Sequence, residues 1–496
     1  MNQEISAQAA RLASERLLQL APAELAPHWS ELQPLLQAFY AALQQGKEPL
    51  LLPAGSLSAA VQTALGLLPL QLCSGTGGEL QLWSQRSFKQ RQRLLSNLAE
   101  RLRSQAGLLL SGGAGTGKTT LIKELLQNCP APVLLMAPTG KAAARLREAL
   151  SPLPATMACG TLHRWLEAGS DGSYRRHAGR PLAAATVVVD EFSVVDGDLT
   201  EALLEALPAT VKLVLVGDPG QLPPIGGPSL LDPLLQLLAA KQPENLRLLS
   251  RSHRFDASTA LGRFVQLLRS NCTAQSLQAQ LELAGNESNL GSINLASLNL
   301  AWHNLATQKT AAGWPQQLLQ RIELQKQQLI EAATDTNHSD AEVLALLDKL
   351  LVLSPRRSGP QGVERLNESW LGIDRLRPGS WPVGTPLLVG RNDTSLGLAN
   401  GDRGILRTGS QGQIEAVIAT AEGPKRHPLA LVPGAEPALA LTVHKSQGSQ
   451  AEAVIVVLPE GELSDRRLLY TALSRAQKRA DLLSPPLKDP EGVSGG

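Results

Sequence analysis

The sequence is poor in several residue types that mark specialised protein classes. Its 496 residues include four cysteines, and no two of them form a CxxC pair. Neither a disulfide framework nor a structural zinc site is therefore indicated, and a reducing compartment is expected. Aromatic residues make up 3% of the chain, and no apolar run reaches the roughly 20 residues that a membrane-spanning helix needs.

An excess of charge and internal repetition are also missing. Forty-six basic residues balance 44 acidic ones to a net charge of +2, so any nucleic-acid binding must come from a local basic surface. No repeat of about 20 to 50 residues is visible, which excludes solenoids and propellers. The N-terminus, MNQEISAQAARLASERL, lacks the basic and apolar segments of a secretory signal peptide. We therefore expect a cytoplasmic protein without a membrane anchor.

The pattern along the chain predicts an α/β protein of several domains. Residues 1–82 are rich in Leu, Ala and Gln at helical spacing, which predicts a helical N-terminal domain. In residues 83–250 apolar strand-like runs alternate with helical patterns, which predicts a parallel sheet covered by helices. Strand signals resume later, so residues 251–379 and 437–496 should form a second α/β domain. Between them, the short runs and Gly and Asp turns of residues 380–436 predict a small β-barrel-like insertion.

A phosphate-binding loop is the clearest motif. SGGAGTGKTT, residues 111–120, follows the apolar run GLLL and precedes the helical LIKELL. In a GxxxxGK[ST] loop between a strand and a helix, backbone N–H groups wrap the phosphates, the lysine contacts them and the next hydroxyl binds Mg²⁺. Lys118 and Thr119 take these two places. The expected nucleotide-binding residues are Gly112, Gly113, Ala114, Gly115, Thr116, Gly117, Lys118, Thr119 and Thr120.

Two further strand ends supply groups that could act on a bound nucleotide. TVVVDEFSVVD brings Asp190 and Glu191 to the carboxyl edge of the sheet, where ligands bind in such folds. Asp190 could hold Mg²⁺ and Glu191 could polarise the attacking water. Alone, this stretch would be explained better by a strand that ends in a solvated acidic turn, but it accompanies a phosphate-binding loop. In LVLVGDPGQLPPIGGP, the Gln221 amide could touch both the γ-phosphate and the water; an exposed glutamine in a Pro/Gly loop is the alternative.

Segments between these motifs suggest what the free energy of nucleotide hydrolysis is used for. APTGKAAARLREAL places a polar loop before a helix whose N-terminus could hold a backbone phosphate. TLHRWL brings a hydroxyl, an imidazole and an indole together, a combination that suits single-stranded nucleic acid. For His163 a structural hydrogen bond is an equal alternative. The candidate contacts are Pro138, Thr139, Gly140, Lys141, Thr161 and His163.

The order of all these motifs resembles one helicase family. GGAGTGKTT, APTGKAAA, TLHRWL, VVVDEFS, GDPGQLPPI, SRSHRF, LTVHKSQGSQAE and LLYTALSRA follow each other as in superfamily 1 DNA helicases of the 5′-to-3′ branch, and most nearly as in the RecD family, the alpha chains of exodeoxyribonuclease V. SPRRSGPQGVERLN and GRNDTSLGLANGDRG also resemble RecD-type segments. The resemblance extends from about residue 83 to 483 and implies two RecA-like P-loop domains, with an SH3-like insertion in the second.

This resemblance also implies roles for single residues. In such helicases the stretch matching LTVHKSQGSQAE faces the cleft and the bound strand, so Thr442, His444 and Ser446 would contact DNA. Lys445 could serve the DNA or the nucleotide. The residues implied to couple the two are Gln447, Gly448 and Glu452.

Two arginines would complete the catalytic set. Arg254 in SRSHRF and Arg475 in TALSRA would reach the γ-phosphate from the second domain as arginine fingers. A surface salt bridge is the alternative for Arg475, and the nearby Arg251 competes with Arg254. Related helicases also place a base-reading glutamine before the P-loop, a position for which Gln85, Gln90, Gln92 and Gln105 compete.

The resulting expectation is an ATP-dependent 5′-to-3′ DNA helicase or translocase that uses ATP and Mg²⁺. By resemblance it would act on single-stranded DNA and duplex ends, in a heterotrimer with RecB-like and RecC-like subunits for double-strand break repair and recombination. No nuclease pattern is visible, so cleavage would come from a partner. Two alternatives remain open: a stand-alone DNA or RNA helicase, and a nucleotide-binding structural or regulatory subunit that does not move.

Overall fold

The computed structural model describes most of the chain and divides it into two compact units. The described residues are 11, 13–14, 23–44, 50–53, 55–65, 67–68, 70–74, 80–169, 171–224, 229–270, 272, 274–289, 299–304, 314–372, 377–393, 395–409, 411–420, 422–459 and 465–485. Unit 1 comprises residues 1–107, 193–205 and 223–245, and unit 2 comprises residues 108–192, 206–222 and 246–496. Within the described residues, no helix is long and apolar enough to cross a membrane.

Unit 1 contains a small sheet as well as helices. Helices α2 (Trp29–Gln44) and α3 (Ala59–Leu65) share one apolar core with strands β1 (Leu50–Leu52), β2 (Leu70–Ser74) and β3 (Leu80–Ser84). The three strands pair antiparallel in the order β1-β3-β2. The prediction of a helical domain for residues 1–82 missed this sheet, because runs such as LLL and LQLCS do not separate a short strand from one face of a helix.

Among its described residues, unit 1 also contains three further α-helices. They are α4 (Gln85–Ser104), most of α8 (Gly197–Ala206) and α9 (Leu231–Lys241). The Ser84 hydroxyl accepts a hydrogen bond from the N–H of Ser87 and so caps α4. Gln90 Nε2 donates to Glu201 at 2.7 Å, so this candidate for the base-reading glutamine is bound to α8.

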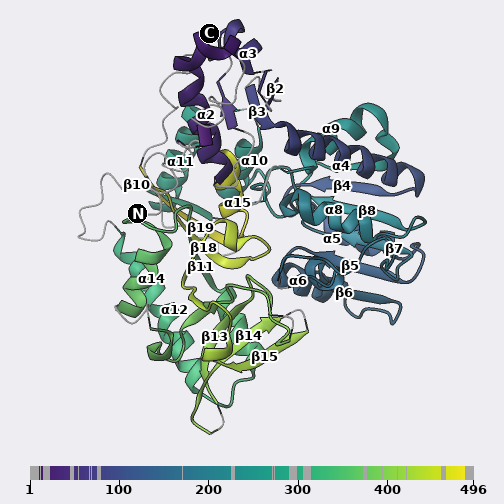
Figure 1. The fold of residues 1–496 in the computed structure, drawn as a ribbon. Coiled ribbons are helices and arrows are strands. Elements are labelled where there is room, and N and C mark those ends of the chain that lie inside the picture. The colour runs from purple at the N-terminus through teal and green to yellow at the C-terminus, as the bar shows by residue number, and fades with distance from the viewer. Residues whose placement is uncertain are drawn as a thin grey trace. The chain divides into compact units, whose positions relative to one another are not determined.

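Unit 2 holds two parallel sheets, which confirms the predicted α/β class (Figure 1). The first has six strands in the order β6-β5-β7-β8-β4-β9. Its strands are β4 (Leu108–Gly112), β5 (Val133–Ala137), β6 (Met157–Thr161), β7 (Thr186–Val189), β8 (Lys212–Gly217) and β9 (Leu246–Leu249). The central runs VLLMA and TVVV are wholly buried, as expected for strands of a parallel sheet. Helices α5 (Lys118–Leu126), α6 (Gly140–Leu150) and α7 (Leu162–Trp165) follow three of the strands.

The second parallel sheet has five strands in the order β10-β19-β18-β11-β17. They are β10 (Asn299–Asn304), β11 (Leu350–Ser354), β17 (Ala440–Thr442), β18 (Ala451–Val457) and β19 (Ala476–Ser484). The accompanying helices are α10 (Ala260–Arg269), α11 (Ala274–Asn289), α12 (Gln316–Thr334), α13 (Asp340–Ala345), α14 (Val363–Leu371) and α15 (Arg466–Leu473). Asp481 of β19 is fully buried, and its carboxylate accepts from Arg321 of α12 and pairs with His303 of β10. This buried cluster ties an edge strand and a helix to the sheet.

A separate antiparallel sheet lies between β11 and β17 in the sequence. Its strands are β12 (Pro386–Leu388), β13 (Arg403–Thr408), β14 (Ile414–Thr420), β15 (Gly423–Pro428) and β16 (Glu436–Pro437), in the order β15-β14-β13-β12-β16. The predicted β insertion is therefore present. Pairing between described residues does not join β15 to β16, so closure into a barrel stays a prediction.

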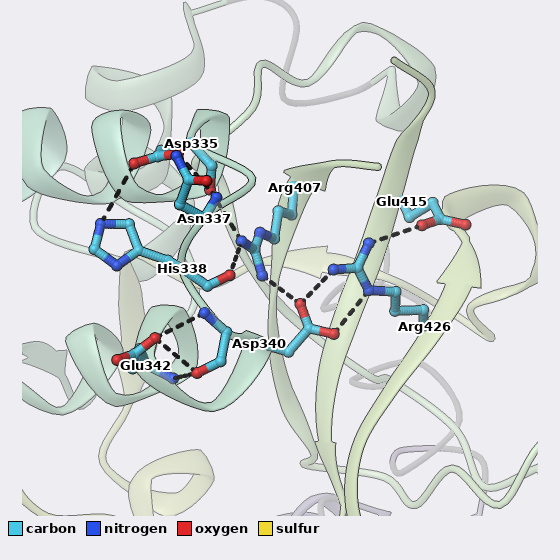
Figure 2. Close-up of polar contacts among 9 residues, drawn as sticks. Asp335, Asn337, His338, Asp340, Glu342, Arg407, Glu415 and Arg426 are labelled. Carbon is cyan, nitrogen blue, oxygen red and sulfur yellow. Dashed lines mark hydrogen bonds and ion pairs between the residues drawn. The ribbon is translucent and has the colours of Figure 1, made fainter. Parts of the chain in front are cut away.

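Two arginines fasten this insertion to α13 through one carboxylate (Figure 2). Arg407 of β13 donates to Asp340 Oδ1 at 2.5 Å, and Arg426 of β15 binds both carboxylate oxygens at 2.7 Å. Burial opposes ionisation of Asp340, but the hydrogen bonds from Arg426 and Arg407 outweigh it and lower the pKa. Arg407 is only 1% exposed and also donates to Asp335 O, so its charge is compensated where water cannot reach it.

Candidate nucleotide site and nucleic-acid surfaces

The phosphate-binding loop lies where β4 ends and α5 begins. Gly115 and Gly117 have φ values of 72° and 83°, a region that favours glycine. Lys118 Nζ donates to Gly112 O at 2.7 Å and to Gly113 O at 2.9 Å, so its side chain folds back over the loop. Residues 114–120 line a cavity of about 710 Å³. Gly112 and Gly113 lie behind them and supply carbonyls that hold the lysine in place.

The two predicted carboxylates enter the same cavity from the end of β7. Asp190 Oδ1 accepts from the N–H of Glu191 at 2.8 Å, and Glu191 has a φ of 53°, rare for a residue with a side chain. Burial and the adjacent charge of Glu191 raise the pKa of Asp190. A divalent cation would oppose both effects, and Thr119 supplies a hydroxyl in the same cavity. These residues therefore fit Mg²⁺, which often completes its shell with water and phosphate oxygens. Groups of three or more His, Cys, Asp or Glu able to hold a metal are absent from the described residues.

Both predicted arginines line this cavity, together with Gln221. Arg475 is 2% exposed and donates through Nε to Thr471 O at 2.9 Å. Burial lowers the pKa of Arg475, while the charge of Glu191 opposes that change. Burial and the charge of Arg475 lower the pKa of Arg254 to about 10. Two cations lining one cavity favour an anionic ligand, and all six predicted catalytic residues meet around it.

Sequence reasoning missed other residues of the cavity. Arg145 of α6, His253 and Gln450 also line it. Arg145 lies inside GKAAARLREAL, a pattern explained by an amphipathic helix, so no separate signal marked it. His253 precedes Arg254, and Gln450 lies between Gly448 and Glu452 in the LTVHKSQGSQAE stretch, so proximity to predicted residues was the available signal.

The first group of nucleic-acid candidates lies at a different hollow. Gly140, Thr161 and His163 line a space of about 550 Å³ together with Lys425 and residues 392–393, 395–399 and 402 of the insertion. Thr139 does not reach it, because its hydroxyl accepts from Ala142 N–H and caps α6. The half-buried Pro138 precedes this cap. The insertion therefore supplies one wall of the surface that the sequence had assigned to the first α/β domain alone.

Lys141 takes a different place from its neighbours. Its ammonium group pairs with Asp348 Oδ1 at 2.7 Å, and Arg403 of the insertion donates to the same oxygen at 3.2 Å. Burial and the charge of Arg403 lower the pKa of Lys141 to about 8. In this conformation Lys141 joins α6 to the second sheet and the insertion. It does not line the hollow of about 550 Å³, nor the hollow of about 300 Å³ beside Thr442 and Lys445.

The TVHKSQG segment divides its residues among several tasks. Thr442 and Lys445 line a second hollow of about 300 Å³, where Lys445 pairs with Glu436 at 2.7 Å. His444 is half-buried in the same turn. Ser446 is fully buried and its hydroxyl donates to Val443 O at 2.7 Å, so in this conformation it stabilises the turn instead of facing a ligand.

The predicted coupling residues also separate. Gln447 Nε2 donates to Leu222 O at 3.1 Å, directly after Gln221 in the chain. Gly448 has a φ of 73°, and its carbonyl accepts from Arg145 Nη1 at 3.0 Å. Both residues therefore link the second sheet to the nucleotide cavity. Glu452 instead pairs with Lys349 and Lys478 and does not line that cavity.

Comparisons with known proteins match the same regions of the chain. A model of the AAA domain matches residues 97–227, and a model of the UvrD-like helicase C-terminal domain matches residues 437–483. The ATP-dependent RecD2 DNA helicase of Deinococcus radiodurans is 27% identical over 407 residues, which cover 77% of this chain and 48% of that protein. The crystal structure of Bacteroides Pif1 bound to ssDNA aligns with a TM-score of 0.42 and 16% identity, over 82% of this chain and 94% of the other.

A curated relative provides the decisive match. The RecBCD enzyme subunit RecD of Mycolicibacterium smegmatis is 35% identical over 410 residues. The alignment covers 76% of this chain and 68% of that protein. The chain therefore belongs to the RecD family of RecBCD enzyme subunits.

Proposed function

We propose that this chain is an ATP-dependent DNA helicase that moves 5′ to 3′ along single-stranded DNA. It would be the RecD-like subunit of a cytoplasmic heterotrimer with RecB-like and RecC-like chains, which repairs double-strand breaks and acts in recombination. The observation that carries the proposal is one cavity lined by Lys118 and Glu191 beside the first sheet and by Arg475 beside the second. Family membership supports DNA as the substrate, the polarity and the partners.

The nucleotide chemistry follows from these side chains. Thr119 and Asp190 would hold Mg²⁺, which neutralises charge developing on the phosphates when it is bound. Lys118 would leave the carbonyls of the loop for the β- and γ-phosphates. Glu191 would polarise the attacking water, while Gln221 would orient it. Arg254 and Arg475 would neutralise the γ-phosphate from the second sheet.

Coupling to movement would use the contacts between the two sheets. Gln447 contacts the residue after Gln221, and Gly448 contacts α6, whose first residue lines the larger hollow. A change in the cavity would thus shift both hollows in which Thr161, His163, Thr442 and Lys445 are placed. We also propose that the two sheets are RecA-like domains, that the insertion is an SH3-like barrel beside the strand, and that the N-terminal domain contacts a partner subunit.

The decisive experiment measures ATP hydrolysis by the purified chain with and without single-stranded DNA. Strong stimulation that disappears in Lys118→Ala is the expected result, with thermal unfolding as the control for folding. Strand displacement on substrates with opposite overhangs then reads the polarity. Absence of stimulation, both for the single chain and after addition of RecB-like and RecC-like chains, would leave a nucleotide-binding structural subunit as the better description.

A further inference from the structure

Residues 252–253 and helix α15 form three hydrogen bonds with Ala114 and Gly115 of the phosphate-binding loop. Tyr470 Oη accepts from Ala114 N–H at 2.8 Å, and Ser252 Oγ donates to Ala114 O at 2.9 Å. The N–H of His253 donates to Gly115 O at 2.8 Å. Two consecutive residues of the loop are therefore fixed by α15, which packs against the second sheet, and by the segment that follows β9. None of these three residues carries a role in the proposed chemistry.

The hydroxyl of Tyr470 has a defined direction in this cluster. Because it accepts from a backbone N–H, its own proton is free to be donated, and Asp218 Oδ2 receives it at 2.7 Å. Asp218 Oδ1 in turn accepts from Gly220 N–H at 3.0 Å. Tyr470 is 1% exposed and Asp218 is fully buried, so neither group can replace a lost partner with water. Burial and the charge of Asp218 raise the pKa of Tyr470, which therefore keeps its proton.

The surrounding backbone is shaped around this ring. A Cβ at Gly220 would lie 3.0 Å from Tyr470 Cε1, and a Cβ at Gly113 would lie 3.0 Å from Tyr470 Oη. Glycine at these positions lets two loops of the first sheet approach the ring closely. The tyrosine thus occupies a narrow gap between the phosphate-binding loop and the loop after β8.

Thr471, the residue after Tyr470 in α15, contacts the neighbour of one catalytic residue and the side chain of another. Thr471 Oγ1 accepts from Leu222 N–H at 2.8 Å, next to Gln221. Thr471 O accepts from Arg475 Nε at 2.9 Å. One stretch of chain therefore contacts the phosphate-binding loop, the loop of the water-orienting glutamine and the arginine finger. A shift of α15 changes the geometry of all three together.

We propose that Tyr470 is a positioning residue for ATP hydrolysis. Its hydroxyl ties the phosphate-binding loop to Asp218, so that loop, Gln221 and Arg475 keep one relative geometry when the cleft closes around the nucleotide. Tyr470 touches neither nucleotide nor DNA in this scheme and acts through Ala114 and Asp218. The inference deepens the proposed function and rests on its nucleotide chemistry, but it does not need DNA stimulation to be true.

The test uses Tyr470→Phe in the full chain, because phenylalanine keeps the ring and removes both hydrogen bonds. We expect kcat for ATP without DNA to fall roughly 10- to 100-fold, with KM changed less than about 3-fold, since misplacing catalytic groups costs rate more than binding. Tyr40→Phe, which removes a hydroxyl from a half-buried tyrosine of unit 1, is the matched control and should keep the wild-type kcat.

A second variant separates positioning from loss of stability. In Tyr470→Phe the Asp218 carboxylate loses its donor, and adding Asp218→Asn removes that buried charge. If positioning is the role, the double variant regains thermal stability while kcat stays low. Wild-type kcat in Tyr470→Phe, or recovery of kcat together with stability in the double variant, would overturn the inference. A wild-type chain that hydrolyses ATP without DNA stimulation would contradict the helicase and leave the test of Tyr470 intact. Absence of any hydrolysis would overturn both.

Discussion

The nucleotide cavity and the surfaces assigned to DNA differ in how well one sequence specifies them. Around the cavity, all six residues predicted to be catalytic come together. On the DNA side, the candidates separate into two hollows, an ion pair and a buried turn. The difference teaches that a motif specifies a site well when its residues follow the ends of parallel strands, as Asp190, Glu191 and Gln221 do in the first sheet. It specifies much less when the site is completed by a module that lies far away in the sequence.

The largest expected effect tests whether the cavity acts as one site. Arg475→Lys keeps the charge but loses the planar fork, so kcat for ATP should fall by about 10³-fold with little change in KM. Steady-state hydrolysis with saturating single-stranded DNA measures it, and thermal unfolding controls for the loss of buried hydrogen bonds. A variant with near wild-type kcat would show that the buried arginine is structural.

A smaller loss is expected when the carboxylate next to Asp190 is neutralised. Glu191→Gln should lower kcat by at least about 10²-fold, because the attacking water loses its polarising group. Nucleotide binding, measured by equilibrium titration, should persist. Glu148→Gln is the matched control, since Glu148 lines the same cavity from the exposed face of α6. Equal losses in both variants would remove Glu191 from the mechanism.

The DNA side of the comparison can be sharpened with two lysines. Lys425 of the insertion lines the larger hollow and pairs there with Glu422 at 3.0 Å, whereas Lys141 pairs with Asp348 and does not line that hollow. Lys425→Ala should weaken binding to a single strand several-fold and lower the magnitude of the salt slope by about 0.7. Lys141→Ala should leave that slope unchanged and lower thermal stability. Fluorescence anisotropy at several salt concentrations measures both slopes. The opposite pattern would show that α6, and not the insertion, supplies the DNA contact.

The smallest effect concerns Asp402, a residue of the insertion that lies against the start of α6. Its Oδ1 has no hydrogen-bond partner among the described residues, and a Cβ at Gly140 would clash with it. Burial raises the pKa of Asp402 to about 7 from an ordinary value of 3.8. The folded chain therefore favours the protonated acid, and stability from this group is lost as pH rises from about 4 to about 7.

The change that isolates this effect is Asp402→Asn. In the wild type, the unfolding temperature should fall by a few degrees between pH 5 and pH 8, and the decline should be shallower in the variant. Differential scanning calorimetry at several pH values measures both curves. Parallel curves would mean that the carboxyl group is hydrated in solution and contributes nothing to the pH dependence.

The sequence predicted the two parallel sheets, the insertion and the cavity, because strand, loop and helix follow each other locally there. The RecD resemblance is confirmed by the match to a curated relative. The small sheet in unit 1 was missed because strands of three to five residues carry no distinctive period. Lys141, Ser446 and Glu452 show the other limit. Asp348 and Lys478, the partners of Lys141 and Glu452, are set by packing between elements, which spacing in one motif does not reveal. Ser446 differs, because it is fully buried and bonds to Val443 within its own turn.

The insertion begins and ends on paired strands, since Leu387 of β12 lies opposite Pro437 of β16. The two points at which the chain leaves and rejoins the second α/β domain are therefore neighbours in space. Such an insertion can change independently in evolution, because its loops can lengthen, shorten or be exchanged without altering the strands that position the residues of ATP hydrolysis. The wall that it contributes to the larger hollow can consequently diverge faster than the nucleotide cavity. Related chains would then share the residues of ATP hydrolysis and differ in the residues that contact DNA.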